Sequence, residues 1–147
     1  MSAAFFDIPV RRIAEEQEVP IRDLTQGAKA IVVVNVASKW GKTGKHYSQY
    51  KEMYEAHAER GLQILANPCN QFGYQESKPE PEIKEFVANR YGVEFPILGK
   101  INVKTKDISP LYQYLYSQAP KAEIKWNFAK FLVDQHGKVV KFFEHGV

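Results

Sequence analysis

Three short segments of this sequence carry side chains that could stabilise a reacting anion. They are the turn at residues 38–43, the amide-rich loop at residues 67–76 and the stretch at residues 125–128. Amide and indole N–H groups are neutral donors, so they stabilise negative charge on sulfur or selenium without competing as bases. Taken singly, such residues are typical of ordinary turns and cores. Together they favour a site for chemistry on an anionic chalcogen.

Trp40 lies in the first of these segments, between a predicted strand at residues 30–37 and a predicted helix at residues 43–60. Backbone N–H groups and the helix dipole at such a turn favour the ionised form of a thiol or selenol. An indole cannot be ionised in that way. Trp40 is therefore a loss of function, a deliberate substitution or a misread residue.

Hydrophobic periodicity predicts the elements that must position the three segments. Besides the strand and helix around Trp40, we expect a weak N-terminal hairpin around residues 14–18, with strands near residues 5–10 and 19–21, a strand at 62–66, a helix at 80–91, a short apolar segment at 95–98, a helix at 110–117, and a hairpin of strands 131–134 and 139–143. Strands that alternate with helices imply an α/β fold with a central mixed sheet flanked by helices.

Composition narrows the class of protein. The 147 residues, 44% of them hydrophobic, predict one domain over 1–147, and a net charge of +3 is too small to indicate a nucleic-acid partner. Cys69 is the only cysteine, so no disulfide can form within the chain and a reducing compartment is favoured. No signal peptide and no apolar run of about 20 residues is present, so we expect a soluble cytoplasmic protein.

The four histidines, His46, His57, His136 and His145, are not spaced as ligands of a metal ion with other side chains. We therefore expect no metal site and no bound cofactor.

The blocks at residues 35–43, 68–76 and 126–128 resemble the three signature blocks of the glutathione peroxidase family, and the similarity runs over nearly the whole chain. The resemblance implies a thioredoxin fold with an N-terminal extension. It places the catalytic tetrad of the family, which is selenocysteine or cysteine, Gln, Trp and Asn, on Trp40, Gln75, Trp126 and Asn127. Three of the four residue types match.

The resemblance also implies a reaction. A selenolate or thiolate at position 40 would attack hydrogen peroxide or an organic or lipid hydroperoxide and become a selenenic or sulfenic acid, which thiols then reduce. Lys42, with Lys45, Lys121 and Lys125 as weaker candidates, could attract the carboxylates of glutathione or the phosphates of a lipid surface. A solvated surface is the alternative interpretation of these lysines.

Two absences indicate a branch of the family. Relatives that use thioredoxin carry a second cysteine near residues 86–88, where this chain has Ala88, so reduction by glutathione or another small thiol is implied. The short connection at 118–124 lacks the insertion of tetrameric relatives, and the chain therefore resembles the monomeric phospholipid-hydroperoxide branch. Because that branch mostly uses selenocysteine, encoded by UGA, we hypothesise that Trp40 marks a selenocysteine codon.

Alternative interpretations remain for Cys69 and for the function of the chain. Cys69 could be redox-active, although a structural role is favoured. The chain could be a catalytically dead binding or regulatory module in which Trp40 fills the pocket; as written, it is expected to be inactive either way. Family members continue past residues 139–143 into a final helix, so we expect that this chain lacks that helix and exposes apolar surface.

Overall fold

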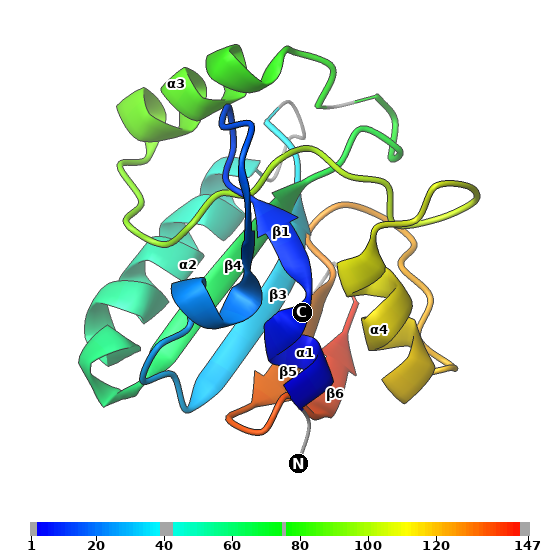
Figure 1. Cartoon of the computed structure of the whole chain (residues 1–147). Helices are drawn as coiled ribbons and strands as arrows, with labels where there is room; N and C mark the ends of the chain where they lie inside the picture. Colours follow the sequence, from blue (N-terminus) through cyan, green and yellow to red (C-terminus); the bar gives the residue numbers. More distant parts are fainter. Residues whose placement is uncertain (1–2, 39–42, 75, 145–147) are drawn as a thin grey trace.

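A computed structural model of the chain describes residues 3–38, 43–74 and 76–144. Within these ranges the chain forms a four-stranded sheet, a two-stranded hairpin and helices on both sides of the sheet (Figure 1).

The sheet is built around β3 (Ala30–Val36), a run of Val and Ile that is buried on both faces. Its strand order is β4-β3-β5-β6. β4 (Leu62–Pro68) pairs with β3 in parallel, whereas β5 (Lys130–Asp134) pairs with β3 in antiparallel orientation and β6 (Val139–Phe143) extends β5 as a hairpin. The predicted mixed sheet is confirmed.

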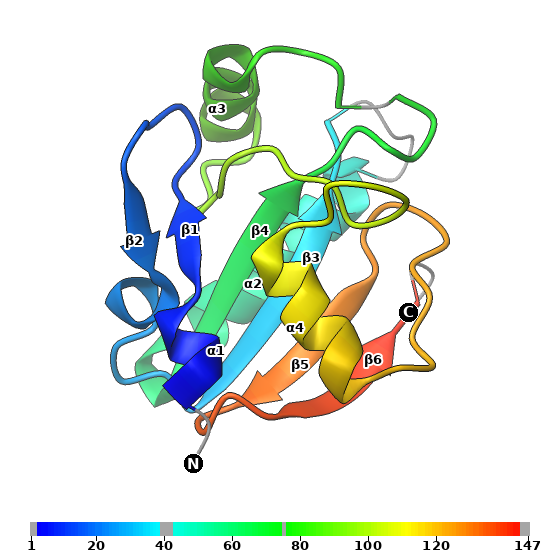
Figure 2. The same ribbon diagram turned by 45° about the vertical axis from the view of Figure 1, so that its right-hand side comes forward.

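Helices cover both faces of this sheet, as Figure 2 shows from the side. They are α1 (Ala3–Asp7), α2 (Thr43–His57), α3 (Glu80–Arg90) and α4 (Pro110–Gln118), with short 3-10 helices at Ile21–Leu24 and Ala58–Arg60. Alternate residues of β3 point to opposite faces. Val32 and Val34 therefore pack with Tyr47 of α2, while Ile31 and Val33 share the other cluster with α1 and α4.

The N-terminal hairpin exists, but its strands are shorter than predicted. β1 (Pro9–Arg11) pairs with β2 (Glu18–Pro20), with Val10 opposite Val19. Phe5, expected in a strand, lies in α1 because Phe5 and Ile8 both turn into the same core cluster. Ile21 begins a 3-10 helix after Pro20, which has no N–H to continue a ladder.

Two further boundaries differ from prediction. The α2 helix ends at His57, and its last predicted residues form the 3-10 turn that leads to Gly61, whose φ of 104° requires glycine. The β4 strand continues to Pro68 because Asn67 and Pro68 stay paired with β3. The buried Asn67 also donates its side-chain N–H to the carbonyl oxygens of Val34 and Leu65.

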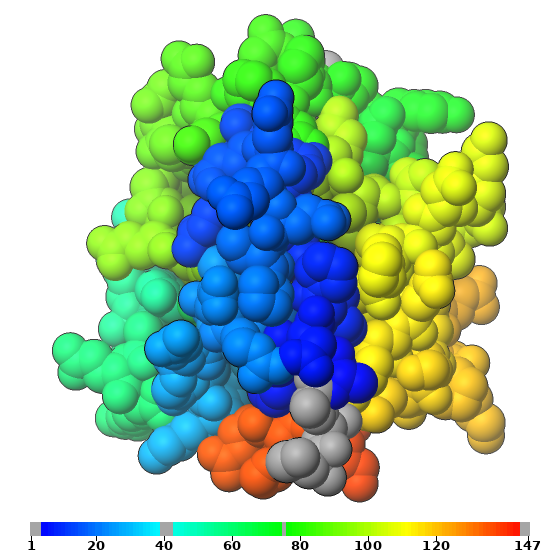
Figure 3. Space-filling view, viewed as in Figure 1, coloured from blue at the N-terminus to red at the C-terminus, as the bar shows by residue number. Residues whose placement is uncertain are grey.

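An ion pair between Arg11 and Glu80 connects the hairpin to α3. The space-filling view in Figure 3 shows the hairpin lying along the front of the molecule. The Arg11 guanidinium donates to both carboxylate oxygens of Glu80, at 2.8 and 2.6 Å. Backbone N–H groups of Ala14 and Lys100 also donate to Glu80, each at 2.9 Å. The hydrogen bonds from Arg11 are the main reason that the pKa of Glu80 falls to about 2.

None of the helices in the described ranges combines the length and apolarity that a membrane crossing requires.

Candidate active site

The three predicted segments meet at one end of the sheet. Because β3 and β4 are parallel, their carboxyl ends lie at the same edge, and the antiparallel β5 begins there. Figure 2 shows the loop that follows β4 and the loop that precedes β5 at this edge of the sheet. The topology therefore brings together parts of the chain that are far apart in sequence.

The turn between β3 and α2 is anchored on both of its flanks. On one side, the Ser38 backbone N–H donates to Glu76 Oε1 at 2.9 Å. On the other, Thr43 Oγ1 donates to the Ala37 carbonyl oxygen at 2.6 Å, at the first residue of α2. Trp40 and Lys42 lie between these anchors and outside the described residues.

The loop after β4 is closed by Glu76, whose side chain is only 1% exposed. Its backbone N–H donates to Asn70 Oδ1 at 3.0 Å, while its carboxylate accepts from Ser38. Glu76 thus ties the second segment to the first. Its neighbour Gln75, the predicted catalytic amide, lies outside the described residues.

The third segment is held by Asn35, a buried polar residue near the carboxyl end of the central strand β3. Asn35 Nδ2 donates to the Trp126 carbonyl oxygen at 3.1 Å, and the Phe128 N–H donates to the Asn35 carbonyl oxygen at 2.6 Å. Asn127, between these two residues, is fully buried. β3 therefore fixes the backbone on either side of the predicted catalytic Asn127.

The second and third segments also contact each other through Phe72. Asn127 Nδ2 donates to the Phe72 carbonyl oxygen at 3.4 Å, a long hydrogen bond. The half-buried Trp126 packs edge-on against the Phe72 ring, with ring centroids 5.9 Å apart. Of the predicted tetrad, the structure places Trp126 and Asn127 side by side with the amide-rich loop.

Two residues next in sequence to the predicted amides have positive φ angles. Phe128, directly after Asn127, has a φ of 66°, and Tyr74, directly before Gln75, has a φ of 54°. Residues other than glycine adopt such angles at a cost of order 1–3 kcal/mol, and they cluster at functional sites. Phe128 is held by stacking on His46 of α2, with ring centroids 4.7 Å apart.

The predicted lysines do not form a cluster. Lys45 is exposed on α2, and Lys121 and Lys125 are exposed in the segment after α4. Among the described residues, none of the three makes an ion pair or a side-chain hydrogen bond. By contrast Lys104, which the sequence did not single out, places its Nζ 4.6 Å from the centre of the Phe72 ring.

Cys69 is a buried free thiol behind the site. Burial is the main cause that raises its pKa, and its Sγ lies 3.6 Å from Gln71 Oε1. A thiol with a raised pKa is a poor nucleophile at neutral pH, in agreement with the predicted structural role.

Among the described residues, no group of three His, Cys, Asp or Glu side chains is arranged to hold a metal ion.

Sequence reasoning did not assign the roles of Asn35 and Glu76. Asn35 is the only polar residue of β3, and a polar side chain inside a buried strand must find hydrogen-bond partners. That signal was available in the sequence. The burial of Glu76 was not readable, because it depends on how the two loops meet.

Comparison with known proteins adds the family. The glutathione peroxidase family model matches residues 5–116, which include the first two segments. The chain belongs to the glutathione peroxidase family. The matched residues end before Trp126 and Asn127, so the place of these two in the site rests on the contacts described above.

A curated relative, the chloroplastic phospholipid hydroperoxide glutathione peroxidase 1 of Arabidopsis thaliana, is 46% identical over 116 residues. This match covers 77% of the chain and 49% of the relative, so the chain spans about half the length of that glutathione peroxidase. The predicted similarity to the phospholipid-hydroperoxide branch is confirmed.

Solved structures show the same fold. The crystal structure of Trgpx in its apo form has a TM-score of 0.75 and 35% identity, and the match covers 97% of this chain and 86% of that one. A thioredoxin from Wuchereria bancrofti, only 12% identical, matches with a TM-score of 0.59 over 93% of this chain and 82% of its own. The predicted thioredoxin fold is confirmed for this glutathione peroxidase family member.

Proposed function

We propose that this site is built to reduce hydroperoxides with electrons from thiols, through a selenocysteine or cysteine at position 40. The observation that carries the proposal is the convergence of the three segments. The Ser38 N–H donates to Glu76, and Asn127 donates to the Phe72 carbonyl oxygen, so the second segment is bonded to both of the others at one edge of the sheet. Membership of the glutathione peroxidase family supports the same reaction.

In the proposed reaction, the selenolate or thiolate attacks one peroxide oxygen and the O–O bond breaks. The leaving alkoxide or hydroxide takes a proton and departs as alcohol or water, and the residue becomes a selenenic or sulfenic acid. A first thiol condenses with that acid and releases water. A second thiol displaces the first as a disulfide, which restores the nucleophile.

Gln75, Trp126 and Asn127 supply the neutral donors in this proposal. Asn127 is fully buried, where a hydrogen bond to an anion is stronger than in water. Trp126 is half-buried at the rim of the loop. These residues stabilise the chalcogen anion and polarise the peroxide without offering a competing base.

The proposed reductant is glutathione or another small thiol. A relay through a second cysteine would need two reactive thiols, whereas this chain has one, and Cys69 is buried. Ala88 occupies the exposed position on α3 where such a cysteine would lie.

The Trp at position 40 makes the chain as written inactive in this proposal, because an indole offers neither a nucleophilic anion nor a site for oxygen transfer. We propose that it marks a selenocysteine codon. Sequencing codon 40 of the native message tests this: UGA supports the proposal, and UGG contradicts it.

We further propose a monomer in a reducing, cytoplasmic setting that acts on lipid as well as small hydroperoxides, with transient contact to membrane surfaces. The free thiol of Cys69 supports the reducing compartment. The exposed lysines and the 79% exposed Tyr74 beside Gln75 are the features that favour contact with a lipid surface.

The second candidate is a thioredoxin-fold binding module without catalysis, and Trp40 itself favours it. The two are separated by replacing Trp40 with Cys or selenocysteine and measuring thiol-dependent consumption of a hydroperoxide. Turnover that the original chain lacks supports the peroxidase. A folded variant with no turnover supports the binding module. Cys69→Ala in the same background is the control, and it should leave the rate unchanged.

A further inference from the structure

A groove lies beside α2, on the face of the sheet that this helix covers. Its cavity volume is about 390 Å³, within the range of small-molecule sites. Residues of α2, β3, β5 and β6 line it. None of them belongs to the segments at 38–43, 67–76 or 125–128, so the groove is separate from the candidate active site.

The walls of this groove are mainly apolar. Val32, Met53 and Leu132 lie in the core cluster on the α2 side of the sheet, and Phe143 of the edge strand β6 completes the lining. Met53, Leu132 and Phe143 are only half-buried. An aliphatic chain in the groove would bury them further, which is worth about fourfold in affinity for each CH₂ that leaves water. The unbranched Met53 side chain adapts readily to such a ligand.

Two polar groups in this apolar lining indicate the charge of the ligand. Lys130 is half-buried at the start of β5, and burial lowers the pKa of its ammonium group. Tyr50 is only 4% exposed, and among the described residues its buried hydroxyl has no hydrogen-bond partner. A buried donor without an acceptor is costly, and a cation in apolar surroundings gains from an anion beside it. One carboxylate would satisfy both groups.

Lys130 also has an interaction within the chain. An ammonium group carries three N–H donors, so it can keep that interaction and still donate to a ligand. A second cation lies close by, because Lys141 Nζ is 5.2 Å from the centre of the Phe143 ring. The groove therefore offers positive charge at one place and apolar surface elsewhere.

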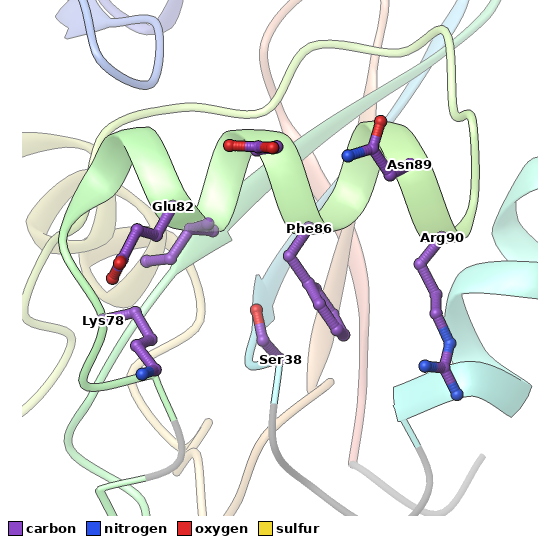
Figure 4. Close-up of a pocket in the computed structure, with 8 residues that line it drawn as sticks. Ser38, Lys78, Glu82, Phe86, Asn89 and Arg90 are labelled. Carbon is purple, nitrogen blue, oxygen red and sulfur yellow. The ribbon is translucent and has the colours of Figure 1, made fainter.

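The sign of its charge distinguishes this groove from the others. The groove along α3 beside Ser38 carries both signs, as Figure 4 shows for Lys78, Glu82 and Arg90. Three further grooves each include a glutamate beside their cations. Among the described residues that line the groove beside α2 there is one cation, Lys130, and no carboxylate. This balance favours an anion that is mostly apolar.

We propose that the groove beside α2 binds a fatty acid, a single carboxylate on an unbranched aliphatic chain. The carboxylate accepts from Lys130 Nζ and from the Tyr50 hydroxyl. The chain lies over Met53, Leu132 and Phe143. The fatty acid is held whether or not it carries a peroxide, so this inference stands apart from the proposed peroxidase function.

Binding is tested on the chain as it exists, with Trp40 in place. Dodecanoate is titrated below its micelle concentration, and side-chain methyl signals are followed by NMR. We expect one dodecanoate per chain and the largest shifts at Met53 and Leu132. Decanoate and octanoate should bind progressively more weakly, by about fourfold for each CH₂ removed. Dodecanol, which lacks the charge, should bind about tenfold more weakly than dodecanoate. Equal binding of the two, or shifts centred away from α2 and β5, would overturn the proposal.

Variants test the two polar groups separately. Lys130→Met keeps an unbranched side chain and should weaken dodecanoate about tenfold, while leaving dodecanol unchanged. Tyr50→Phe removes only the hydroxyl and should weaken dodecanoate about threefold. Lys138→Met, in the turn between β5 and β6 and outside the lining, is the matched control and should change neither ligand. Equal losses of dodecanoate binding in Lys130→Met and Lys138→Met would contradict the site. The comparison of dodecanoate with dodecanol on the unsubstituted chain decides even where a variant fails to fold.

A second copy of the chain is the competing occupant of this groove. Sedimentation velocity, run with and without dodecanoate, separates the two. A monomer that binds one dodecanoate supports the fatty-acid site. A dimer in which dodecanoate leaves the Met53 and Leu132 methyl signals unshifted would show that the groove is an interface between copies, and it would overturn the proposal.

Discussion

The polar residues at the end of β3 and the lysines around them differ in how firmly the fold holds them. Asn35, Glu76 and Asn127 are buried and bonded to backbone groups of other segments. Lys45, Lys121 and Lys125 extend into solvent from separate elements. Buried dipoles that are already oriented stabilise a transition state at no further cost, whereas exposed charges are screened. The rate of hydroperoxide turnover in a variant with a restored nucleophile should therefore depend strongly on the buried residues and only weakly on the exposed lysines.

The largest effect is expected at Asn127. In the Trp40→Cys background, Asn127→Ala should lower kcat/KM for the hydroperoxide about 100-fold, or about 3 kcal/mol, because one buried donor to the reacting anion is lost. Steady-state kinetics measure it, and thermal unfolding shows whether the variant stays folded. Asn102→Ala removes an amide whose side chain donates to Lys106, and it should change the rate little. Equal losses of kcat/KM in the two variants would show that the buried Asn127 has no special role.

The next effect compares two ion pairs, one part-buried and one exposed. Arg11 and Glu80 are part-buried and joined by two hydrogen bonds, whereas Arg22 and Asp7 form an exposed pair. Glu80→Gln should lower the free energy of unfolding at pH 7 by about 2 kcal/mol. Asp7→Asn should cost less than about 0.5 kcal/mol.

The pH dependence of the Glu80 effect follows from its pKa. Because folding lowers this pKa from 4.5 to about 2, the contribution is complete above about pH 4.5 and is lost as the pH falls toward 2. Denaturant unfolding at pH 7, 4 and 3 should show the unsubstituted chain and Glu80→Gln converging. If the difference in free energy of unfolding between the two proteins stays constant with pH, the ionised Glu80 carboxylate is not the source of this stability.

A smaller effect is expected at Glu76. Glu76→Ala leaves the Ser38 N–H without its acceptor, so the free energy of unfolding should fall by about 1.5 kcal/mol. Glu76→Gln keeps a carbonyl oxygen for that bond and should recover most of the loss. Turnover in the Trp40→Cys background should follow the same order. Gln behaving like Ala would show that the charge, not the hydrogen bond, matters.

The smallest effects are expected at the lysines. Lys45→Gln, Lys121→Gln and Lys125→Gln, each in the Trp40→Cys background, should change the KM for glutathione less than about twofold, because exposed charges contribute little. A fivefold rise for any one of them would show that the fold holds that lysine in a binding site after all.

Much of the fold was readable from the sequence because its signals are local. The apolar run of β3 and the helical spacing of Tyr47 and Tyr50 each lie within one element. The N-terminal segment was misjudged at Phe5, because in so short a stretch the same apolar residues fit a strand or a helical turn.

The site was readable only in part. Trp126 and Asn127 were found through their resemblance to a family motif, and the structure places them against Phe72. The supporting role of Glu76 depends on two loops meeting in space, which no local pattern reports. The scatter of the lysines was equally hidden, because exposed side chains leave no periodic signal.

The hydrogen bond from Asn35 to Trp126 joins residues 91 positions apart. A contact of such range closes late in folding, and a chain emerging from the ribosome completes β3, α2 and β4 well before residue 126 is made. Until then β3 is an edge strand of a half-built sheet, and the Asn35 amide lacks its partner. The segments of the candidate site are consequently joined only once the last hairpin has docked on β3.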